Sequence, residues 1–338
     1  MTAIHTDAAL TSLNTLGLTA SAARFATVRE HADLLQLLAD ATLRAQLWHV
    51  LGGGSNLVLP ERVEGLTVQV AVPGRRLLRE DDDAYYVAAG GGENWHDFVQ
   101  WTLAQGWGGL ENLSLIPGTV GAAPIQNIGA YGVEVKDRLF ALTAWSLQDG
   151  APRVFSNAEC AFAYRDSIFK QAEAGRWLIA EVVFRLPKNA PLVTGYGDLQ
   201  QEIAAQGLPL SHAGVAQAVM AVRRRKLPDP AQIGNAGSFF KNPIIAASQR
   251  DALLQQFPQL VSYPAGEGLA KLAAGWLIEQ AGWKGRRLGP VGMYEKQALV
   301  LVNHGGAARA DVAALTAAVQ GDVAARFGVQ LEAEPVWW

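Results

Sequence analysis

The 338-residue sequence predicts a fold of mixed helices and strands built in at least two parts. Its length suggests roughly two or three domains. Half of the residues are hydrophobic and only 17% are charged, which is enough apolar material for sizeable cores. Segments with strand and helix patterns follow one another along the chain. The prolines at 187–191 interrupt the chain and the sequence pattern changes from about residue 211, so we place the boundary between the parts near 190–210.

The first part alternates helical and strand-like segments. Leucines at helical spacing predict a helix over 29–46, and a second helix is expected over 92–106, where Gly106 stops it. Strands are expected at 48–52, 66–70, 84–90, 139–148 and 177–186. The strands at 66–70 and 84–90 are expected to lie on either side of the Pro-Gly turn at 73–74.

The second part has longer helical patterns. A helix over 212–226 is ended by the Pro-Asp-Pro of 228–230, and a polar loop follows at 234–242. Helical segments are expected near 246–257, 269–281 and 311–328, with a buried strand at 298–303 and a short strand at the C-terminus.

Composition and charge exclude several classes of protein. The formal charge of −3 argues against a nucleic-acid or anionic-membrane surface. No apolar segment approaches the roughly 20 residues of a membrane helix, and no signal peptide is evident. The single cysteine, Cys160, excludes an internal disulfide and a thiolate metal cluster, so we expect it to pack as a small apolar side chain. A cytoplasmic protein is expected.

The stretch Gly109–Lys136, here called the glycine loop, carries the strongest functional signal. Glycines at 118, 121, 129 and 132 remove Cβ, so the backbone can adopt positive φ and approach a ligand closely. The exposed amides suit a diphosphate or the polar edge of a flat ring. The alternative is an ordinary surface loop, but loops of this length are usually functional or disordered, and its apolar residues argue against disorder.

A second glycine segment, LGGGSNLVLP at 51–60, lies between two predicted short strands. A Rossmann fingerprint would open a helix, and no Walker lysine is present, so neither common phosphate-binding fold fits. A glycine turn between strands can still present amides to a diphosphate, with Asn56 adding side-chain hydrogen bonds. A plain hairpin turn is the alternative. His96 and His304 have no second ligand at metal spacing, so core or surface roles are expected and no metal site is predicted.

Eight motifs occur in order: GGGSN (52–56), IPGTVGAAPIQNIGAYG (116–132), YRDSIFK (164–170), TGYGDL (194–199), KLPDP (226–230), GNAGSFFKNP (234–243), KLAAGWLIEQAGWKG (271–285) and LEAEP (331–335). Together they resemble the family of UDP-N-acetylenolpyruvoylglucosamine reductases, also called UDP-N-acetylmuramate dehydrogenases. The resemblance runs from about residue 14 to 334. The TGYGDL motif is similar to the subclass that carries a tyrosine loop.

The resemblance implies an α+β protein with an FAD-binding fold of the vanillyl-alcohol-oxidase (PCMH) type. That domain would span 14–190, in lobes of roughly 14–70 and 71–190, and a separate α+β substrate-binding domain would span 205–338, with its C-terminal tail returning to the active site. FAD would be bound non-covalently, with NADPH as co-substrate. The implied reaction reduces the enolpyruvyl group of UDP-N-acetylglucosamine-enolpyruvate to the D-lactyl ether of UDP-N-acetylmuramate, a peptidoglycan precursor. A monomer is expected.

The same resemblance assigns three catalytic residues. Arg165 would grip the substrate carboxylate with two parallel hydrogen bonds. Ser238 would protonate the carbon of the enolate, with Lys241 or Lys226 stabilising the resulting alkoxide. Glu334 matches the catalytic glutamate. Without the resemblance, an ion pair of Arg165 with a neighbouring acid, a turn role for Ser238 and a solvated Glu334 would each be the ordinary interpretation.

Further residues match positions that contact FAD or the sugar nucleotide in this family. The FAD set is Gly52, Gly53, Gly54, Ser55, Asn56, Pro117, Gly118, Thr119, Gly121, Ala122, Asn127, Gly129, Ala130, Tyr131 and Gly132. The sugar-nucleotide set is Tyr196, Lys226, Asn242 and Gln297. Glycines on either side of Tyr196 suit a flap that closes over a ligand.

The sequence departs from the family at its end. The family continues past the glutamate with a Val-Arg pair and a further strand, whereas Pro335-Val-Trp-Trp closes this chain. A flavin contact from an arginine at that place is therefore in doubt. Two other functions remain open: an FAD-dependent alcohol or hydroxy-acid oxidase or dehydrogenase of the same fold, and a non-catalytic flavin- or nucleotide-sugar-binding protein. The carbon-protonating hydroxyl argues against alcohol oxidation, which needs a general base.

Overall fold

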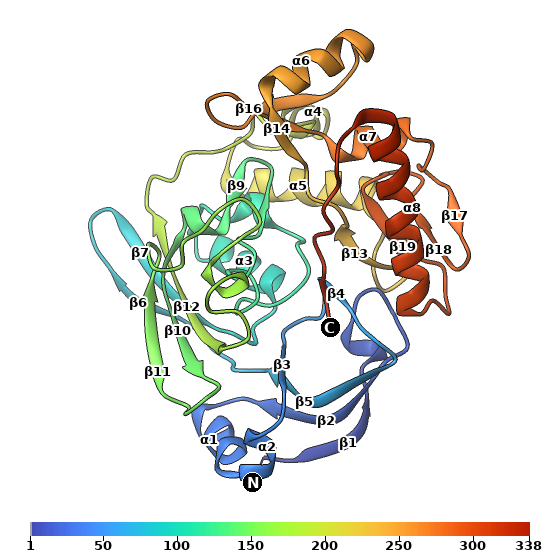
Figure 1. Cartoon of the computed structure of the whole chain (residues 1–338). Helices are drawn as coiled ribbons and strands as arrows, with labels where there is room; N and C mark the ends of the chain where they lie inside the picture. Colours follow the sequence, from blue (N-terminus) through green and yellow to red (C-terminus); the bar gives the residue numbers. More distant parts are fainter. Residues whose placement is uncertain (1) are drawn as a thin grey trace. The chain divides into compact units, whose positions relative to one another are not determined.

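The computed structural model describes residues 2–338 and divides the chain into two compact units, whose elements are labelled in Figure 1. Unit 1 comprises the residues up to Ala8, Ala22–Gly54 and Val63–Arg225, and unit 2 comprises Ala9–Ser21, Ser55–Arg62 and Lys226–Trp338. The predicted division into an FAD domain and a substrate domain stays a prediction, because dense contacts do not by themselves define a ligand-binding domain.

A four-stranded sheet begins unit 1, in the order β1 (Ile4–Ala9), β2 (Ser21–Val28), β5 (Arg62–Val70) and β3 (Trp48–Leu51). Helices α1 (His31–Ala39) and α2 (Ala41–Arg44) accompany it. The single helix predicted over 29–46 is therefore wrong. The Asp40 side chain accepts hydrogen bonds from the amides of Thr42 and Leu43, so Asp40 starts a second helix instead of continuing the first.

The second sheet of unit 1 is antiparallel. Its order is β11 (Pro152–Ser156), β10 (Leu139–Ser146), β12 (Trp177–Pro187), β7 (Ala84–Gly90) and β6 (Arg75–Glu80). The strands expected at 66–70 and 84–90 lie on either side of the Pro-Gly turn as predicted, but an additional strand, β6, follows the turn and pairs with β7, while β5 belongs to the other sheet. Leu77 and Leu78 of β6 are both exposed, which removed the alternation that marks a strand.

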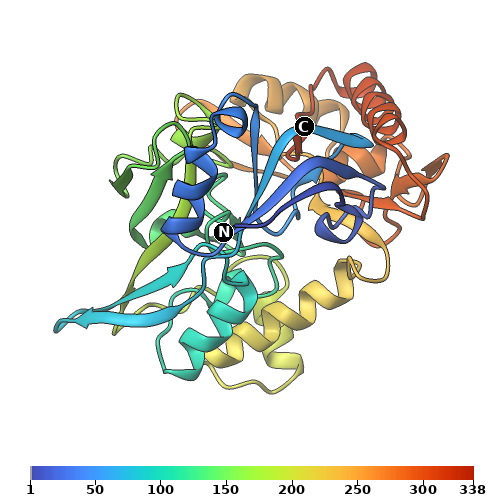
Figure 2. The same ribbon diagram turned by 90° about the horizontal axis from the view of Figure 1, so that it is seen from below.

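Three helices complete unit 1: α3 (Trp95–Ala104), α4 (Leu199–Ala205) and α5 (His212–Lys226). The prediction of a helix over 212–226 is confirmed. Seen from below in Figure 2, α3 and α5 lie alongside each other. The His212 ring at the start of α5 contacts the buried carboxylate of Glu111, in the segment that follows α3, through Nδ1 at 2.8 Å. The glycine loop contains the short elements η2 (Glu111–Leu113), β8 (Gly129–Ala130), β9 (Val133–Glu134) and η3 (Val135–Asp137).

Unit 2 contains a sheet in the order β13 (Gly234–Ser238), β19 (Val300–Asn303), β18 (Val291–Met293) and β17 (Arg287–Leu288). A smaller sheet has the order β14 (Ile244–Ala246), β16 (Leu269–Leu272) and β15 (Ser262–Pro264), and the helices are α6 (Ala247–Gln256), α7 (Ala274–Gln280) and α8 (Arg309–Phe327). The helix expected over 269–281 is therefore confirmed only over α7, because the residues at the start of that range form strand β16. Further 3₁₀ turns are η1 (Thr11–Leu13) in unit 2 and η4 (Ile168–Lys170) in unit 1.

A two-stranded parallel pair joins β4 (Leu57–Val58) to β20 (Val336–Trp337) in unit 2. The last residues of the chain, from Glu334 on, therefore run beside residues that are almost 280 positions earlier in the sequence. This pairing fixes the C-terminal residues that the sequence singles out as unusual.

Cys160 is fully buried in the core of the second sheet, as predicted, and burial raises the pKa of its thiol to about 12. Within residues 2–338 no helix is both long and apolar enough to cross a membrane. The same residues contain no group of three or more His, Cys, Asp or Glu side chains that could hold a metal ion.

Candidate cofactor and substrate site

The two glycine segments singled out by the sequence lie against each other in unit 1. A Cβ on Gly53 would lie 2.7 Å from the Cα of Gly118, and a Cβ on Gly52 would lie 2.8 Å from Oγ1 of Thr119. Both distances are too short for any real side chain, so only glycine permits this approach. The sequence indicated each segment separately, and the structure shows that they form one strip of bare backbone.

Within residues 2–338, several buried polar atoms of unit 1 lack a protein hydrogen-bond partner, as does Thr15 of unit 2. The hydroxyl of Thr119, Oδ1 of Asn112 and Nε of Arg223 are buried without a hydrogen-bond partner in the part of the chain that the structure describes. Buried polar atoms are nearly always paired in folded proteins, so such atoms indicate a missing ligand or water. Bare backbone together with unsatisfied polar atoms fits a cofactor such as FAD, which combines a diphosphate with a flat polar ring.

Substituting Gly53 with alanine is expected to remove most of the bound FAD, because the new methyl group would force the backbones of Gly53 and Gly118 apart. We expect the flavin content after gel filtration to fall at least tenfold, measured by absorbance per mole of protein. Gly321→Ala is the matched control, since a Cβ there meets open space in the middle of α8. A Gly53→Ala protein with normal flavin content would contradict the proposed role of this strip.

The glycine loop holds three residues with side chains in the left-handed region: Leu115 at φ 58°, Asn127 at φ 47° and Tyr131 at φ 49°. Such conformations cost free energy and persist only where the surroundings impose them. The Asn127 side chain donates to Glu134 and to the carbonyl of Ala163, and it accepts from the amide of Lys136. Its amide group is used to shape the loop, so any contact of Asn127 with FAD would come from its backbone.

The start of α3 clamps the glycine loop through the backbone. The amide of Trp95 donates to the carbonyl of Gly118, and the amide of Val120 donates to the carbonyl of Glu93. His96 adds a side-chain contact, which the sequence did not reveal: its Nδ1 accepts the amide hydrogen of Leu115 at 3.1 Å. A lone histidine carries no spacing signal, so sequence alone could only assign it a core or surface role.

Arg165 lies at the tip of a two-residue turn between Ala163 and Asp166, which exchange backbone hydrogen bonds in both directions. Its own φ is 55°, again the left-handed region. Nη2 donates to the carbonyl of Gly129 at 2.8 Å, and a Cβ on Gly129 would come within 3.0 Å of Nη1. The guanidinium is therefore held against the glycine loop by a strained turn, which is typical of a functional position.

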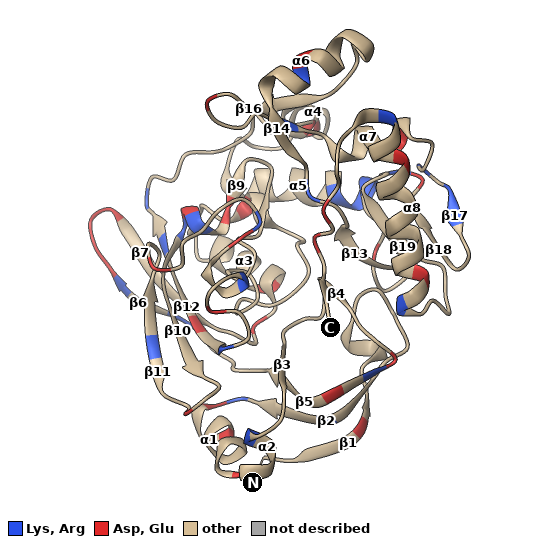
Figure 3. Ribbon diagram, in the orientation of Figure 1, with Lys and Arg blue, Asp and Glu red and all other residues tan. Residues whose placement is uncertain are grey.

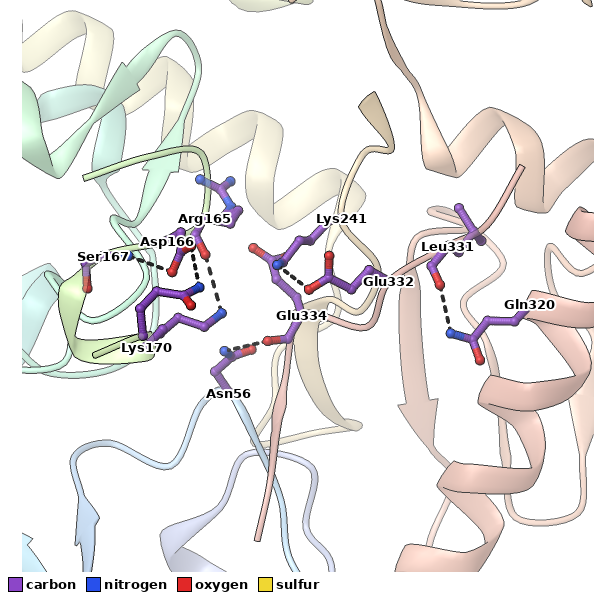
Figure 4. A network of polar contacts seen from close by, with 11 residues as sticks. Asn56, Arg165, Asp166, Ser167, Lys170, Lys241, Gln320, Leu331, Glu332 and Glu334 are labelled. Carbon is purple, nitrogen blue, oxygen red and sulfur yellow. Dashed lines mark hydrogen bonds and ion pairs between the residues drawn. The ribbon is translucent and has the colours of Figure 1, made fainter. Parts of the chain in front are cut away.

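The neighbours of Arg165 have their own partners (Figure 4). Asp166 accepts from the amide of Ser167 and from the side chain of Gln171, and Lys170 donates to the carbonyl of Arg165. This network stabilises the backbone of the turn. In Figure 4 the side chain of Arg165 points away from these neighbours.

In unit 2, backbone pairing brings the segments of Ser238 and Glu334 together. The amide of Glu334 donates to the carbonyl of Phe239, and the amide of Lys241 donates to the carbonyl of Glu332. Ser238 ends β13 directly after Gly237, whose φ is 68°, and Ser238 is exposed. Glu334 is only 7% exposed, and its carbonyl accepts a hydrogen bond from Asn56 (Figure 4). The segments of the predicted proton donor and the predicted glutamate thus lie side by side, joined by these hydrogen bonds and by the isolated bridge between Phe240 and Ala333.

The predicted sugar-nucleotide residues of unit 2 meet at the start of α7. Oδ1 of Asn242 accepts the amide hydrogen of Ala274, at 2.9 Å. Oε1 of Gln297 lies 3.2 Å from where a Cβ on Gly275 would be. Gly275 therefore allows Gln297 to approach the helix, so these two amide side chains lie against the same turn.

The other two predicted residues lie elsewhere. Tyr196 is 44% exposed in unit 1, and its ring contacts the ring of Tyr131 edge-on, with centroids 6.3 Å apart. Burial raises the pKa of Tyr131, so its hydroxyl stays protonated at neutral pH. Lys226 is the last residue of α5 and begins the last segment of unit 2, at the end of the basic run visible in Figure 3.

Comparisons with known proteins agree with the resemblance. Residues 22–155 match the model of a family described as an FAD binding domain, and residues 229–338 match the C-terminal domain of UDP-N-acetylenolpyruvoylglucosamine reductase. The chain is 59% identical to the UDP-N-acetylenolpyruvoylglucosamine reductase of Bdellovibrio bacteriovorus over 97% of this chain and 98% of that protein. It is 52% identical to the protein of the same name from Pseudomonas aeruginosa, over 95% of each chain.

A solved structure of the same family is similar over the whole chain. The crystal structure of the reductase from Thermus caldophilus covers 100% of this chain and 99% of its own, with a TM-score of 0.67 and 24% sequence identity. At that identity the likeness supports the fold alone. The predicted α+β fold, with an FAD-binding domain of the PCMH type and a second domain, is confirmed.

Proposed function

Because the chain belongs to the UDP-N-acetylenolpyruvoylglucosamine reductase family, whose members are FAD-containing oxidoreductases, we propose that it reduces UDP-N-acetylglucosamine-enolpyruvate to UDP-N-acetylmuramate with NADPH in the cytoplasm. One structural observation supports it most: the pairing of Glu334 with Phe239, which sets the predicted glutamate beside the predicted proton donor. The product serves peptidoglycan synthesis.

When bound and reduced by NADPH, FAD would supply a hydride to the terminal CH2 carbon of the enol ether. The backbone strip at Gly52–Gly53 and Gly118–Thr119 would hold its diphosphate, since these positions present amides and the unsatisfied hydroxyl of Thr119. Asn112 and Arg223 offer further unsatisfied polar atoms in the same unit. No His or Cys in the matched segments is placed to link the flavin covalently, so FAD would be bound non-covalently.

Arg165 would bind the carboxylate of the substrate. Addition of hydride puts negative charge on the carbon next to that carboxylate, and the charge spreads into it as an enolate. A guanidinium stabilises this developing charge better than it stabilises the neutral double bond, which is the condition for catalysis. The strained turn and the hydrogen bond to Gly129 hold the guanidinium in place before the charge forms.

Ser238 would then donate a proton to the enolate carbon. A hydroxyl is a weak acid, but an enolate is a strong base, so the transfer is feasible where the alkoxide is stabilised. Lys241 and Lys226 are the two cations that the neighbouring sequence offers. Lys241 also pairs with Glu332 at 2.5 Å. The buried Glu334 would act beside the enolate in its protonated or hydrogen-bonded form, because a bare carboxylate would repel the charge.

Tyr196→Phe and Lys226→Ala are each expected to raise the Michaelis constant for the sugar nucleotide more than tenfold while the FAD content stays normal. The loss of one charge-assisted contact costs about 1.5–3 kcal/mol. Lys284→Ala is the control. Lys284 follows α7 in the sequence, and its side chain donates a hydrogen bond to Glu279. Unchanged Michaelis constants in both variants would remove these residues from the substrate site.

Steady-state NADPH oxidation tests the proposed function itself. The holoprotein should be yellow, and NADPH consumption should depend on UDP-N-acetylglucosamine-enolpyruvate. Oxidation of alcohols or hydroxy acids instead would support the oxidase alternative. A flavin that binds but never turns over with either substrate would support a binding protein.

A further inference from the structure

His96 is the second residue of α3; its side chain contacts the glycine loop and is half-buried. Its Nδ1 accepts the amide hydrogen of Leu115, so this nitrogen must be unprotonated, and the ring proton of the neutral form resides on Nε2. A protonated ring would place an N–H donor against the N–H of Leu115. The hydrogen bond therefore exists only in the neutral state of His96.

The amide that His96 holds belongs to a strained residue. Leu115 has a φ of 58°, which a leucine adopts only under constraint, and it lies three residues before Gly118. Gly118 is the residue whose backbone closes on Gly53. The neighbouring clamp contacts, from Trp95 to Gly118 and from Val120 to Glu93, are backbone hydrogen bonds that do not titrate. The bond to His96 is a contact of this clamp that pH can break.

We propose that His96 is a positioning residue that holds the glycine loop in its FAD-binding conformation, and that its protonation in mild acid releases the cofactor. The proposal rests on FAD binding by unit 1, which belongs to the proposed function. His96 does not need to touch FAD, because it acts through the amide of Leu115 and the backbone that follows it.

The charges around His96 favour its neutral form at neutral pH. Burial lowers its pKa most, and Arg224 and Arg223 of α5 lower it further, while Asp97 of α3 opposes them. The unfolded chain has the ordinary histidine pKa of about 6.5. The stabilisation from the neutral ring is therefore complete above that pH and is lost as the pH falls toward the lowered folded pKa.

The test measures FAD that passes an ultrafiltration membrane, from pH 8 to pH 5, on wild-type holoprotein and two variants. In His96→Asn the side-chain Oδ1 takes the place of Nδ1 and cannot be protonated in this range, so we expect FAD to stay bound throughout. In His96→Leu the amide of Leu115 loses its acceptor, so we expect FAD affinity to be about tenfold or more weaker already at pH 8. The wild type should match His96→Asn at pH 8 and release FAD as the pH falls through the lowered pKa of His96, which lies below the ordinary histidine value of about 6.5.

His304→Asn is the matched control, because the pKa of His304 is also lowered by burial and by Arg287, yet it lies in unit 2, away from the glycine loop in sequence. It should show the wild-type release curve. Far-ultraviolet circular dichroism at each pH separates release from unfolding. The proposal is overturned if His96→Asn and wild type release FAD at the same pH, if release coincides with unfolding in both, or if His96→Leu retains full affinity. A wild type that binds no FAD at pH 8 would instead contradict the proposed function.

Discussion

Ser238→Ala is expected to leave the reduction of FAD by NADPH close to its normal rate and to slow the reaction with the enolpyruvyl substrate by about 10²–10⁴-fold, the usual loss when a general acid is removed. The physical reason is that Ser238 would act only after hydride has reached the substrate. Its position at the end of β13, following the left-handed Gly237, exposes the hydroxyl without using it in the sheet. Cysteine at 238 should restore part of the rate, since a thiol is nearly isosteric and a stronger acid.

Stopped-flow spectroscopy of each half-reaction measures these effects separately. Ser248→Ala, at an exposed serine of α6, is the control and should behave as the wild type in both. If both half-reactions of Ser238→Ala slow equally, or neither slows, then Ser238 is a structural turn residue and the proton comes from another group.

Arg165→Lys is expected to lower kcat/KM for the enolpyruvyl substrate by about 10²–10³-fold, comparable to the loss of one donor from an oxyanion site. Lysine keeps the positive charge but cannot form two parallel hydrogen bonds to a carboxylate. The backbone of the turn should persist, because Ala163 and Asp166 close it without the side chain of Arg165.

Flavin content must be measured in the same variant, because Arg165 also donates to the carbonyl of Gly129 in the glycine loop. Normal flavin content with lost activity indicates carboxylate recognition, whereas parallel loss of both indicates a structural tie. Arg153→Lys, on the edge strand β11, should change neither quantity. A kcat/KM within threefold of the wild type would exclude Arg165 from the reaction.

Local patterns allowed several elements to be predicted. The helix over 212–226 was predictable because an apolar stripe ends at a Pro-Asp-Pro stop, and the strands around 52–56 were predictable because β-rich residues flank a glycine turn. The break of the first helix at Asp40 was not, since a single capping side chain outweighs a continuous leucine pattern. Strand β16 was not predictable, because four residues are too few for their hydrophobic periodicity to distinguish a strand from a helix.

In the candidate site, too, contacts between residues far apart in the sequence could not be predicted. Glycine content indicated that the segments at Gly53 and Gly118 could approach a ligand, but nothing in the sequence said that they approach each other. The juxtaposition of Glu334 and Phe239 depends on pairing between residues far apart in the chain, and the roles of Ser238 and Glu334 came from motifs shared with a family. His96 has no motif, and its contact with Leu115 became visible only with the fold.

The interleaved segments of the two units bear on how the protein is made. Leu16, Leu18 and Val58 are buried in the core of unit 2, although most of that unit follows Lys226. During synthesis the apolar side chains of these early segments stay exposed to solvent until over 160 later residues have left the ribosome. A fragment that starts at Lys226 would lack the acceptor that Leu16 offers to Asn303 and the strand that receives the chain end. Neither unit is a contiguous stretch of the chain. We therefore expect the nascent chain to depend on chaperones, and a truncated chain that contains only one contiguous part not to fold.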